Sequence, residues 1–475
     1  MSPSTSSGPE SPAPPGLRAS KLLGARILWI TVVAIAIVLI GLMTLFYVGS
    51  VVDPVEHLSG LPVLVVNEDS GSTVGTQQVS IGKQVVAALM TTSAVSTKLS
   101  LDSVTMPEAL ALLDKNAAYA AIVIPSNLTV STLGLYGVNP SNGPAPSLPS
   151  IRLLTNVRAG SLGVSLATGV ADPALTAISH AVGHKIAGTV PGTVASSASM
   201  SALRKNPFTL TTVAYRPLPP HSALGLSAFY VSLLATMCGF LGATLINATI
   251  DGALGYATNE VGPKWQQRMP VRITRWQTLL AKWAMALVIP PILTGLMLLV
   301  AIGILRMDAS HIALLWVFLS FAAVVIAMGT LVLFAALGNL GQLVAILLFV
   351  YLALASSGGT IPLQALPGVL KFTANFEPLR QILDGTRSIL YFNASGAAGL
   401  TRGFILTGLG FVLWLILGVA ITTWYDRRGL HRMQPELLDY VNRSAAAYAE
   451  GAHDPPAVAP LQRAETVRTH GDDGE

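Results

Sequence analysis

Six apolar runs in this chain approach or reach the length needed to cross a lipid bilayer, and none contains Asp, Glu, Lys or Arg. A helix needs about 20 consecutive apolar residues to span the hydrocarbon core. Only 11% of the 475 residues are charged, whereas soluble domains carry about 25%. The runs therefore predict an α-helical polytopic membrane protein with six transmembrane helices, at residues 27–48, 223–246, 283–305, 312–336, 340–355 and 404–424.

Two of these runs contain features that interrupt a regular helix. The run at 340–355 is short and follows Asn339, so it either spans with its polar end at the interface or forms a broken or re-entrant helix. Pro290 and Pro291 lie inside the run at 283–305 and remove two backbone donors, which predicts a kink. The kink serves either helix packing or a hinge for gating, and packing is the simpler interpretation.

Residues 53–220, between the first two runs, carry charges again and alternate between β-branched runs and helical periods. This alternation indicates an α/β domain. A linker rich in Pro, Gly and Ser at 139–149 divides the domain into two parts. The predicted strands lie at 61–67, 98–102, 119–124 and 151–155, and the predicted helices lie at 79–90, 106–115 and 160–189.

Lys and Arg near the predicted spans set the orientation, because short cytoplasmic loops carry an excess of these residues. With six spans, three basic clusters fall on one side of the membrane, and they outweigh the mixed charges of the outer loop at 356–402. The clusters are Arg18, Lys21 and Arg26; Lys264, Arg268, Arg272, Arg275 and Lys282; and Arg427, Arg428 and Arg432.

We therefore expect a multi-pass protein of the cell membrane with both termini in the cytoplasm. The expected organisation is a disordered cytoplasmic N-terminus at 1–26, a transmembrane helix at 27–48, an extracytoplasmic α/β domain at 53–220, a five-helix membrane domain at 223–424 and a largely disordered cytoplasmic tail at 425–475.

The sequence predicts no catalytic site, no cofactor and no metal. Gly82 and Lys83 do not belong to a phosphate-binding loop, because the flanking glycine and hydroxyl residues are missing. Cys238 is the only cysteine, which excludes an intramolecular disulfide and a cysteine-based metal cluster. His180 and His184 lie one turn apart, but no third ligand is placed by the sequence, so surface histidines are the simpler interpretation. We expect no enzyme activity and no nucleic-acid partner.

Three stretches of the chain carry a family resemblance: residues 61–71 (LPVLVVNEDSG), residues 106–128 (MPEA followed by AAIVIPSNL) and residues 357–362 (SGGTIP). They resemble the phage infection protein (Pip) family, which belongs with the permeases of type-2 ABC exporters. The layout of one span, a large outer domain and five further spans also agrees. The compact outer domain and the Glu377-Pro378 sequence fit better a shorter branch, known mostly as a domain of unknown function and related to a fungal drug-resistance membrane protein.

The resemblance singles out two groups of residues, a candidate ATPase-coupling loop and a set of family landmarks. In type-2 permeases the cytoplasmic loop between the second and third spans contacts an ATPase, whereas spacing alone favours a membrane anchor built on Trp265 and Trp276. The candidate ATPase-coupling residues are Glu260, Lys264, Arg268, Arg272 and Arg275. The family landmarks are Asn67, Glu68, Asp69, Gly71, Gly358, Gly359 and Pro362; for the first four, turn chemistry is a simpler interpretation than a ligand site.

Residues 376–392 form a predicted amphipathic helix, with Arg380, Asp384 and Arg387 on one face. Such a helix lies flat on the outer membrane surface, covers an exit pathway as a lid, or does both.

Two functions fit the whole pattern. The first is a permease that exports a hydrophobic or amphipathic substrate, lipid-linked or drug-like, as a homo- or hetero-dimer in the lipid bilayer, with energy from a separate ATPase subunit. The alternative is a non-transporting scaffold or receptor whose outer domain binds a secretion, cell-wall or phage partner. A proton-coupled carrier is disfavoured because ionisable residues are nearly absent from the spans.

Overall fold

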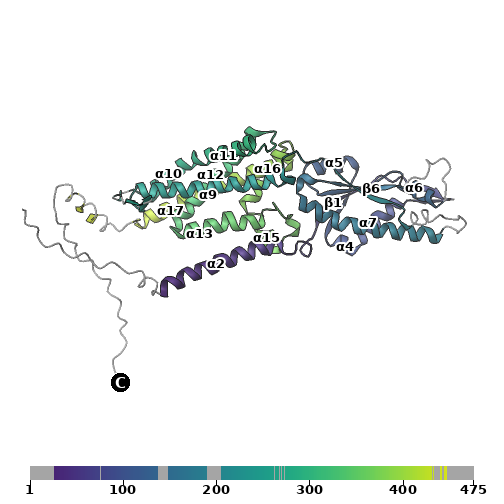
Figure 1. The fold of residues 1–475 in the computed structure, drawn as a ribbon, viewed down its shortest axis with the longest axis horizontal. Helices are drawn as coiled ribbons and strands as arrows, with labels where there is room; N and C mark the ends of the chain where they lie inside the picture. The colour runs from purple at the N-terminus through teal and green to yellow at the C-terminus, as the bar shows by residue number, and fades with distance from the viewer. Residues whose placement is uncertain are drawn as a thin grey trace, which may run out of the picture.

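The computed structural model describes residues 26–136 except 75, residues 148–189, residues 205–430 except 262, 267, 269 and 272, and residues 432, 439, 440, 443, 444 and 446. The disorder predicted for the N-terminus and for most of the C-terminal tail lies outside these residues, as does most of the predicted linker. Figure 1 shows an elongated molecule with a helical bundle in the middle and an α/β domain at one end.

Six helices of the described chain are long and apolar enough to cross a membrane, which is the composition of a multi-pass membrane protein. They are α2 (Arg26–Val51), α7 (Ser161–Thr189), α9 (Ser227–Ala253), the continuous stretch formed by α10 (Arg275–Ala286), α11 (Ile289–Leu298) and the π-helical η3 (Leu299–Ile304), α12 (Ile312–Leu337) and α17 (Leu400–Arg427).

Five of these six helices coincide with predicted spans, whereas α7 coincides with the helix predicted at 160–189 in the α/β domain. Helix α7 qualifies by length and composition, yet Leu166, Ala171 and Leu175 are buried in the same core as the sheet. We therefore assign α7 to the α/β domain. The run at 340–355, predicted either as a span or as a broken helix, is a shorter apolar stretch made of three consecutive pieces: α13 (Leu340–Ile346), the π-helical η4 (Leu347–Leu352) and α14 (Ala353–Ser356).

The predicted break at the two prolines is present. Helix α10 ends at Ala286, and Pro290 and Pro291 lie in the first turn of α11. A proline is tolerated in the first turn because the backbone donors there have no partner within the helix.

The α/β domain, which lies between α2 and α9 in the chain, contains a five-stranded mixed sheet with the order β4-β1-β5-β6-β7. β1 is parallel to both β4 and β5, β6 is antiparallel to β5, and β7 is parallel to β6. The strands are β1 (Leu61–Asn67), β4 (Leu99–Ser103), β5 (Ala120–Ile124), β6 (Ser150–Thr155) and β7 (Thr209–Ala214).

The four strands predicted from the sequence are confirmed within one residue at each end. β7 was not predicted, because it is an edge strand whose residues are mostly exposed. An edge strand needs no apolar alternation, so it leaves little signal in the sequence.

Alternate residues of the central strands enter two separate cores, as the period of two in a strand requires. Val63, Val65 and Ile122 face the core beneath α3 (Ile81–Thr91), α4 (Ser93–Ser96) and α7. Leu64 and Val123 face a smaller core beneath α5 (Met106–Asp114). The domain therefore has three layers, with most of its apolar area on the α7 side. Its remaining elements are β2 (Ser72–Val74), β3 (Gln77–Val79), α6 (Leu128–Leu135) and η1 (Val157–Ala159).

Helix α12 forms the centre of the bundle, because α9, α10, α11, α13, α16 and α17 all pack against it. Over the 18 residues that define its apolar window, 78% are buried, compared with 11% for α17 and 6% for α2. The poorly buried helices present apolar side chains outward, as lipid-facing helices do. The shorter elements near the sheet are η2 (Ala223–Gly225), η5 (Leu363–Ala365), α15 (Gly368–Thr373), α16 (Pro378–Tyr391) and η6 (Gly396–Ala398).

The prediction of a surface helix at 376–392 was wrong in its placement. A helix exists there as α16, but eleven of its fourteen residues are buried, and it packs against α9, α12 and α17. Gly385 approaches the ring of Phe318 on α12 so closely that no Cβ fits between them. The polar face that the sequence shows is therefore directed into protein and not toward water or lipid headgroups.

Candidate functional site

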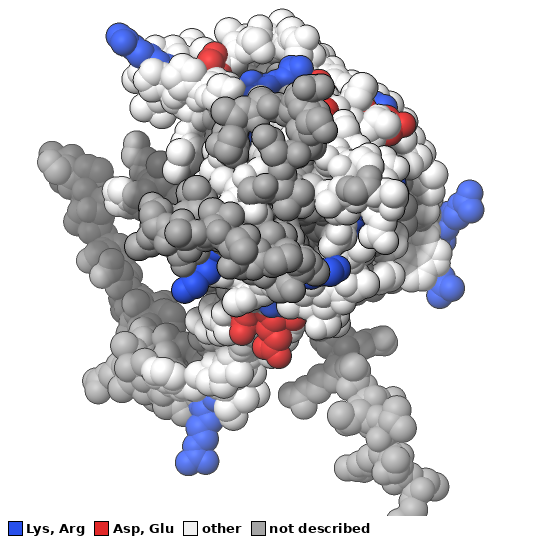
Figure 2. All heavy atoms as spheres, turned by 90° about the vertical axis from the view of Figure 1, so that its right-hand side faces the viewer, with Lys and Arg blue, Asp and Glu red and all other residues white. Residues whose placement is uncertain are grey.

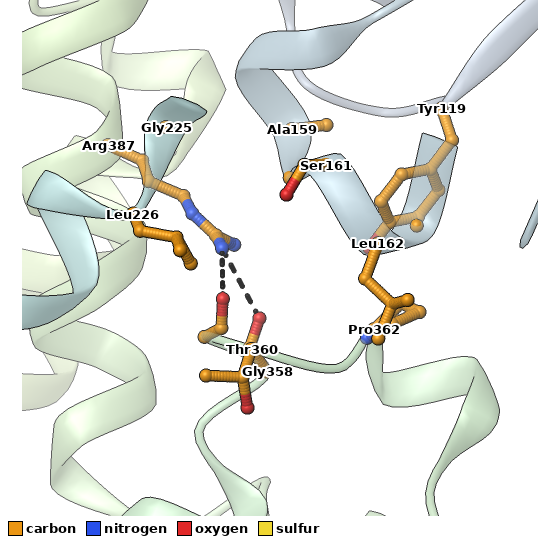
Figure 3. Close-up of a pocket in the computed structure, with 13 residues that line it drawn as sticks. Tyr119, Ala159, Ser161, Leu162, Gly225, Leu226, Gly358, Thr360, Pro362 and Arg387 are labelled. Carbon is orange, nitrogen blue, oxygen red and sulfur yellow. Dashed lines mark hydrogen bonds between the residues drawn. The ribbon is translucent and has the colours of Figure 1, made fainter. Parts of the chain in front are cut away.

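The α/β domain meets the bundle where four segments converge: the residues after β6, the residues before α9, the segment 357–362 and α16. Figure 3 shows this junction, with Arg387 of α16 on one side and Tyr119 at the start of β5 on the other. Residues far apart in the sequence line one small cavity there, including Gly160, Leu226 and Thr360.

Arg387 is the buried cation of the junction, with a relative exposure of 6%. Its Nη2 donates to the carbonyl oxygens of Gly358 at 3.4 Å and Gly359 at 3.1 Å (Figure 3). Its Nε has no hydrogen-bond partner among the described residues. A buried charge is costly unless it is fully bonded, so this arginine is held in an incompletely satisfied state.

The two glycines that Arg387 contacts have separate reasons to be glycine. Gly358 has φ of +72°, in the left-handed region that side chains disfavour. Gly359 has no room for a Cβ, because the ring of Phe229 on α9 lies against it. Pro362 lines the same cavity. The predicted landmarks Gly358, Gly359 and Pro362 are thus brought together at the junction.

Arg158 forms a second link between the α/β domain and the bundle. Its Nη1 donates to the carbonyl oxygen of Tyr391, the last residue of α16, at 2.8 Å. Its Nε and Nη2 donate to the carbonyl oxygen of Pro217. The Tyr391 hydroxyl in turn lies 2.7 Å from the Ser227 hydroxyl and accepts a bond from the backbone N–H of Ala228. Arg158 therefore connects the sheet to α16 and, through it, to the first turn of α9.

A third link joins the end of α2 to the segment before α16. The backbone N–H of Ser59 donates to the carbonyl oxygen of Gln364 at 3.1 Å, and Lys371 donates to the hydroxyl of Ser59 at 3.0 Å. The segment 357–373 is therefore bonded both to the chain that enters the sheet and to α16.

The cavity at the junction has a volume of about 10 Å³, which is room for about one water molecule. It is too small for an organic substrate. The described conformation is therefore one in which the junction is closed.

Glu377, immediately before α16, is a second buried ionisable group near the junction, with a relative exposure of 2%. Its carboxylate oxygens accept bonds from the backbone N–H groups of Leu379 at 2.7 Å and Arg380 at 2.8 Å, so it caps α16. Burial raises the pKa of Glu377 from 4.5 to about 7, although these backbone donors act in the opposite direction. The sequence signal for this cap is an acid directly before Pro378.

The landmark residues 67–71 lie at the carboxyl end of β1, an interior strand of the sheet, and have their own hydrogen bonds. Asp69 accepts from the hydroxyl of Ser80 and the backbone N–H of Gly82, both at 2.9 Å. It also accepts from the backbone N–H and the hydroxyl of Thr129. One carboxylate thereby caps the first turns of both α3 and α6. Asn67 accepts from the N–H of Asp69, which shapes the turn.

Glu68 is exposed, and Gly71 has φ of +71° with the carbonyl oxygen of Val79 only 2.8 Å from where a Cβ would lie. The hydrogen bonds of Asp69 and the left-handed backbone of Gly71 therefore account for these two landmark residues on structural grounds.

The loop predicted to contact an ATPase forms a hairpin between α9 and α10. Glu260 lies in β8 (Asn259–Val261) and Lys264 lies in β9 (Lys264–Gln266). Arg268 is exposed and lines a shallow pocket beside the end of α9. Arg272 lies outside the described residues. Arg275 is not in the hairpin but begins α10, where its Nε donates to the carbonyl oxygen of Leu430 at 2.8 Å.

The same end of the bundle contains a buried ion cluster that the sequence did not reveal. Asp251 of α9 pairs with Lys282 of α10 at 2.7 Å and with both terminal nitrogens of Arg432 at 2.7 and 2.8 Å. Asn247 accepts a further bond from Lys282. Asp426 of α17 accepts from the first two backbone N–H groups of α10. No sequence spacing relates these residues, since the partners are 31 to 181 positions apart.

The family model described as "Protein of unknown function (DUF3533)" matches residues 31–415, from inside α2 to inside α17. No curated protein matches the sequence.

Proposed function

Because this chain belongs to the DUF3533 family of proteins of unknown function, we propose its function from its geometry. It is a permease-like membrane protein that exports a hydrophobic or amphipathic substrate, lipid-linked or drug-like, with energy from a separate ATPase subunit. With residues 340–356 as the sixth crossing in place of α7, the α/β domain lies outside the cell membrane and both termini lie in the cytoplasm.

The observation that carries this proposal is the bonded junction between the α/β domain and α16. Arg158, Arg387 and Tyr391 connect the sheet, the segment 357–362 and the first turn of α9. Because α16 packs against α9, α12 and α17, a movement of α16 changes the bundle and the α/β domain together. A pure membrane anchor has no need for such a bonded contact between its outer domain and the interior of the bundle.

The interrupted segment next to this junction supports the same proposal. Residues 340–356 contain a π-helical stretch between two α-helical pieces, and the segment 357–362 leaves the helix altogether. Non-helical backbone at membrane depth is tolerated where it is covered by protein or lines a pathway. In the proposed mechanism this segment and α16 form the outer gate, which is closed in the described conformation.

In the proposed mechanism, the ATPase subunit contacts the opposite end of the bundle. The hairpin of β8 and β9 connects α9 to α10, and the ion cluster at Asp251 joins these two helices to the segment after α17. A partner that moves the hairpin therefore moves three spanning helices. The resemblance to type-2 permeases supports the assignment of Glu260, Lys264, Arg268, Arg272 and Arg275 to ATPase coupling. In this proposal, the exposed apolar faces of α2 and α17 contact lipid or a second subunit of a dimer.

The outer face of the α/β domain is relevant to the scaffold alternative. Figure 2 shows its described part as mainly uncharged, with Lys and Arg scattered and Asp and Glu in small groups. It has no broad charged patch among the described residues in this view, so it gives no specific support to a strongly charged partner.

The experiment is a pull-down of the detergent-solubilised protein from its native host, with cross-linking. We expect an ATPase to copurify with the wild type and to be lost when Glu260, Arg268 and Arg272 are replaced by Ala. The matched control is Arg402→Ala, at an exposed position in the first turn of α17. Recovery of partners of the outer domain without any ATPase would reject the permease and support the scaffold.

A further inference from the structure

A cavity opens at the end of the bundle that carries the ion cluster, between α10, the end of α12 and α17. Its volume is about 270 Å³, far larger than that of the closed junction. Among the described residues that line it are three cations, Arg275, Lys282 and Arg432, and no carboxylate.

The charges around this cavity leave an excess of positive charge. Asp251 faces Lys282 and Arg432, and Asp426 is bonded to the backbone at the start of α10. Arg275 has no carboxylate bonded to its side chain among the described residues. Counting both acids against the three cations leaves a net charge of +1 in a partly buried site. An anion is therefore favoured there.

Arg275 has donors to spare. Its Nε donates to the carbonyl oxygen of Leu430, and its guanidinium lies over the ring of Tyr425, 4.9 Å from the ring centre. No hydrogen bond between described residues uses its two terminal nitrogens. Arg432 is held in the same way, bidentate to Asp251 and 4.7 Å over the ring of Tyr256. Two guanidinium groups are thus fixed in position before any ligand arrives.

One part of the cavity wall is apolar, and so is the surface beside it. Leu279 and Phe334 contribute to the wall. Leu280 is 51% exposed, and Leu337 is 46% exposed, on the outside of the helices that form the cavity. A ligand with a phosphate group and apolar chains matches this combination, since the phosphate meets the cations while the chains run along the outer surface.

We propose that this cavity binds the phosphate headgroup of an anionic phospholipid. The site does not depend on the exporter proposal, because it rests on the end of the helical bundle alone. The bound headgroup bridges α10 and the segment after α17, so it stabilises the end of the bundle next to the β8–β9 hairpin. Phosphate is the shared chemistry of a lipid headgroup and of the free ion, and the test separates these two sources.

The test measures the thermal unfolding of the purified full-length protein in detergent, followed by the fluorescence of its tryptophans. Short-chain phosphatidylglycerol, phosphatidylcholine and sodium phosphate are added separately at equal ionic strength. We expect phosphatidylglycerol to raise the Tm, while phosphatidylcholine and millimolar phosphate leave it unchanged. An equal rise with free phosphate would overturn the lipid as the source, and an equal rise with phosphatidylcholine would overturn the site.

The variant Arg275→Gln places the response in the cavity. Loss of one charged hydrogen-bond donor should raise the half-saturating phosphatidylglycerol concentration by about tenfold. The matched control is Arg428→Gln, which removes an equal charge from an exposed position near the end of α17 that does not line the cavity. An equal weakening in Arg428→Gln would show a general effect of charge and would reject the proposal.

A second variant covers a failure of Arg275→Gln to fold. Arg432→Gln removes one cation from the cavity, lowers its net charge from +1 to zero and leaves Asp251 paired with Lys282. We expect it to weaken the phosphatidylglycerol response as Arg275→Gln does. An unchanged response in Arg432→Gln would contradict the proposal.

Discussion

At the scale of single residues, three buried or half-buried charges decide local structure. Asp69 accepts four hydrogen bonds at the start of two helices, Glu377 caps α16, and Arg387 bridges two carbonyl oxygens at the junction. In each case the partner is mainly backbone or hydroxyl and not an opposite charge. Charge-assisted hydrogen bonds to backbone are strong and directional, so each of these residues fixes the angle at which a segment enters a helix.

The double cap at Asp69 predicts a local effect on two helices. Asp69→Ala removes the acceptor of the Gly82 and Thr129 N–H groups and should destabilise the α/β domain by about 2–4 kcal/mol, since each cap contributes roughly 1–2 kcal/mol. Hydrogen exchange should accelerate in peptides covering both α3 and α6. Glu68→Gln alters an exposed neighbour and should leave the exchange unchanged. Acceleration in only one helix would contradict the double cap.

The buried carboxyl of Glu377 predicts a pH dependence of stability. The pKa of this carboxyl is about 7 in the folded protein, compared with 4.5 for an unburied Glu, so folding favours the protonated form. The resulting contribution of Glu377 to the free energy of unfolding is on the order of 3 kcal/mol. It is fully present below pH 4.5 and is lost as the pH rises through 7.

The measurement is the Tm of the purified protein between pH 4.5 and 8, compared with Glu377→Gln. The variant should lose most of the fall in Tm over this range. Glu56→Gln, at an exposed carboxyl, should retain it. A wild-type and a Glu377→Gln profile that run parallel would show that this group does not titrate in the window.

At the scale of elements, the bundle depends on small residues where helices approach closely. At Gly239 of α9, a Cβ would lie 2.9 Å from the Cβ of Ile326 on α12 and would also meet the carbonyl oxygen of Ala323. In the same way, a Cβ on Gly329 of α12 would overlap the ring of Trp414, and a Cβ on Gly418 of α17 would overlap the ring of Trp283. Helices in a membrane gain little from apolar burial against lipid, so close van der Waals packing holds them together.

The α9–α12 contact predicts a difference between two glycine substitutions. Gly239→Ala should force the helices apart and lower the free energy of unfolding by about 1–3 kcal/mol. Gly408→Ala on α17 meets nothing within 4 Å and should be neutral or slightly stabilising, because alanine favours a helix. Thermal unfolding in detergent compares the two variants. Equal Tm values would contradict close packing at Gly239.

At the scale of the whole molecule, the α/β domain and the bundle are joined by the hydrogen bonds of Arg158 and of Ser59, and Arg387 lines the cavity between them. The domain is not suspended on flexible connections, because hydrogen bonds from two separate chain segments reach α16 and the segment before it. Such a connection lets the two ends of the elongated molecule respond to each other, which is what the proposed export mechanism requires.

The proposed orientation predicts which positions a membrane-impermeant maleimide reaches in intact cells. In a Cys238→Ala background, Ser100→Cys before α7 and Asn206→Cys after it should both be labelled, and Thr258→Cys at the other end of the bundle should not. All three positions are exposed. Labelling of only one of the first two would show that α7 crosses the membrane. Labelling of Thr258→Cys alone would reverse the orientation.

The sequence by itself determined the elements whose signal is local. Long apolar runs gave the spanning helices α2, α9, α12 and α17, and β-branched runs gave β1, β4, β5 and β6 nearly residue by residue. Period and length are sufficient there because the signal of each element lies within its own residues. The turn at 67–71 and the Gly-rich segment at 357–362 were also visible, since left-handed backbone requires glycine.

Only the tertiary structure decided what depends on a distant partner. The sequence predicted residues 160–189 as a helix of the α/β domain, but by length and composition α7 also qualifies as a spanning helix; its burial against the sheet supports the domain assignment. The polar face of α16 suits a membrane surface as well as a buried junction, and the carbonyls of Gly358 and Gly359 decide for the junction. The cluster of Asp251, Lys282 and Arg432 joins residues up to 181 positions apart. Electrostatic pairing follows distance in space, which no local pattern in the chain encodes.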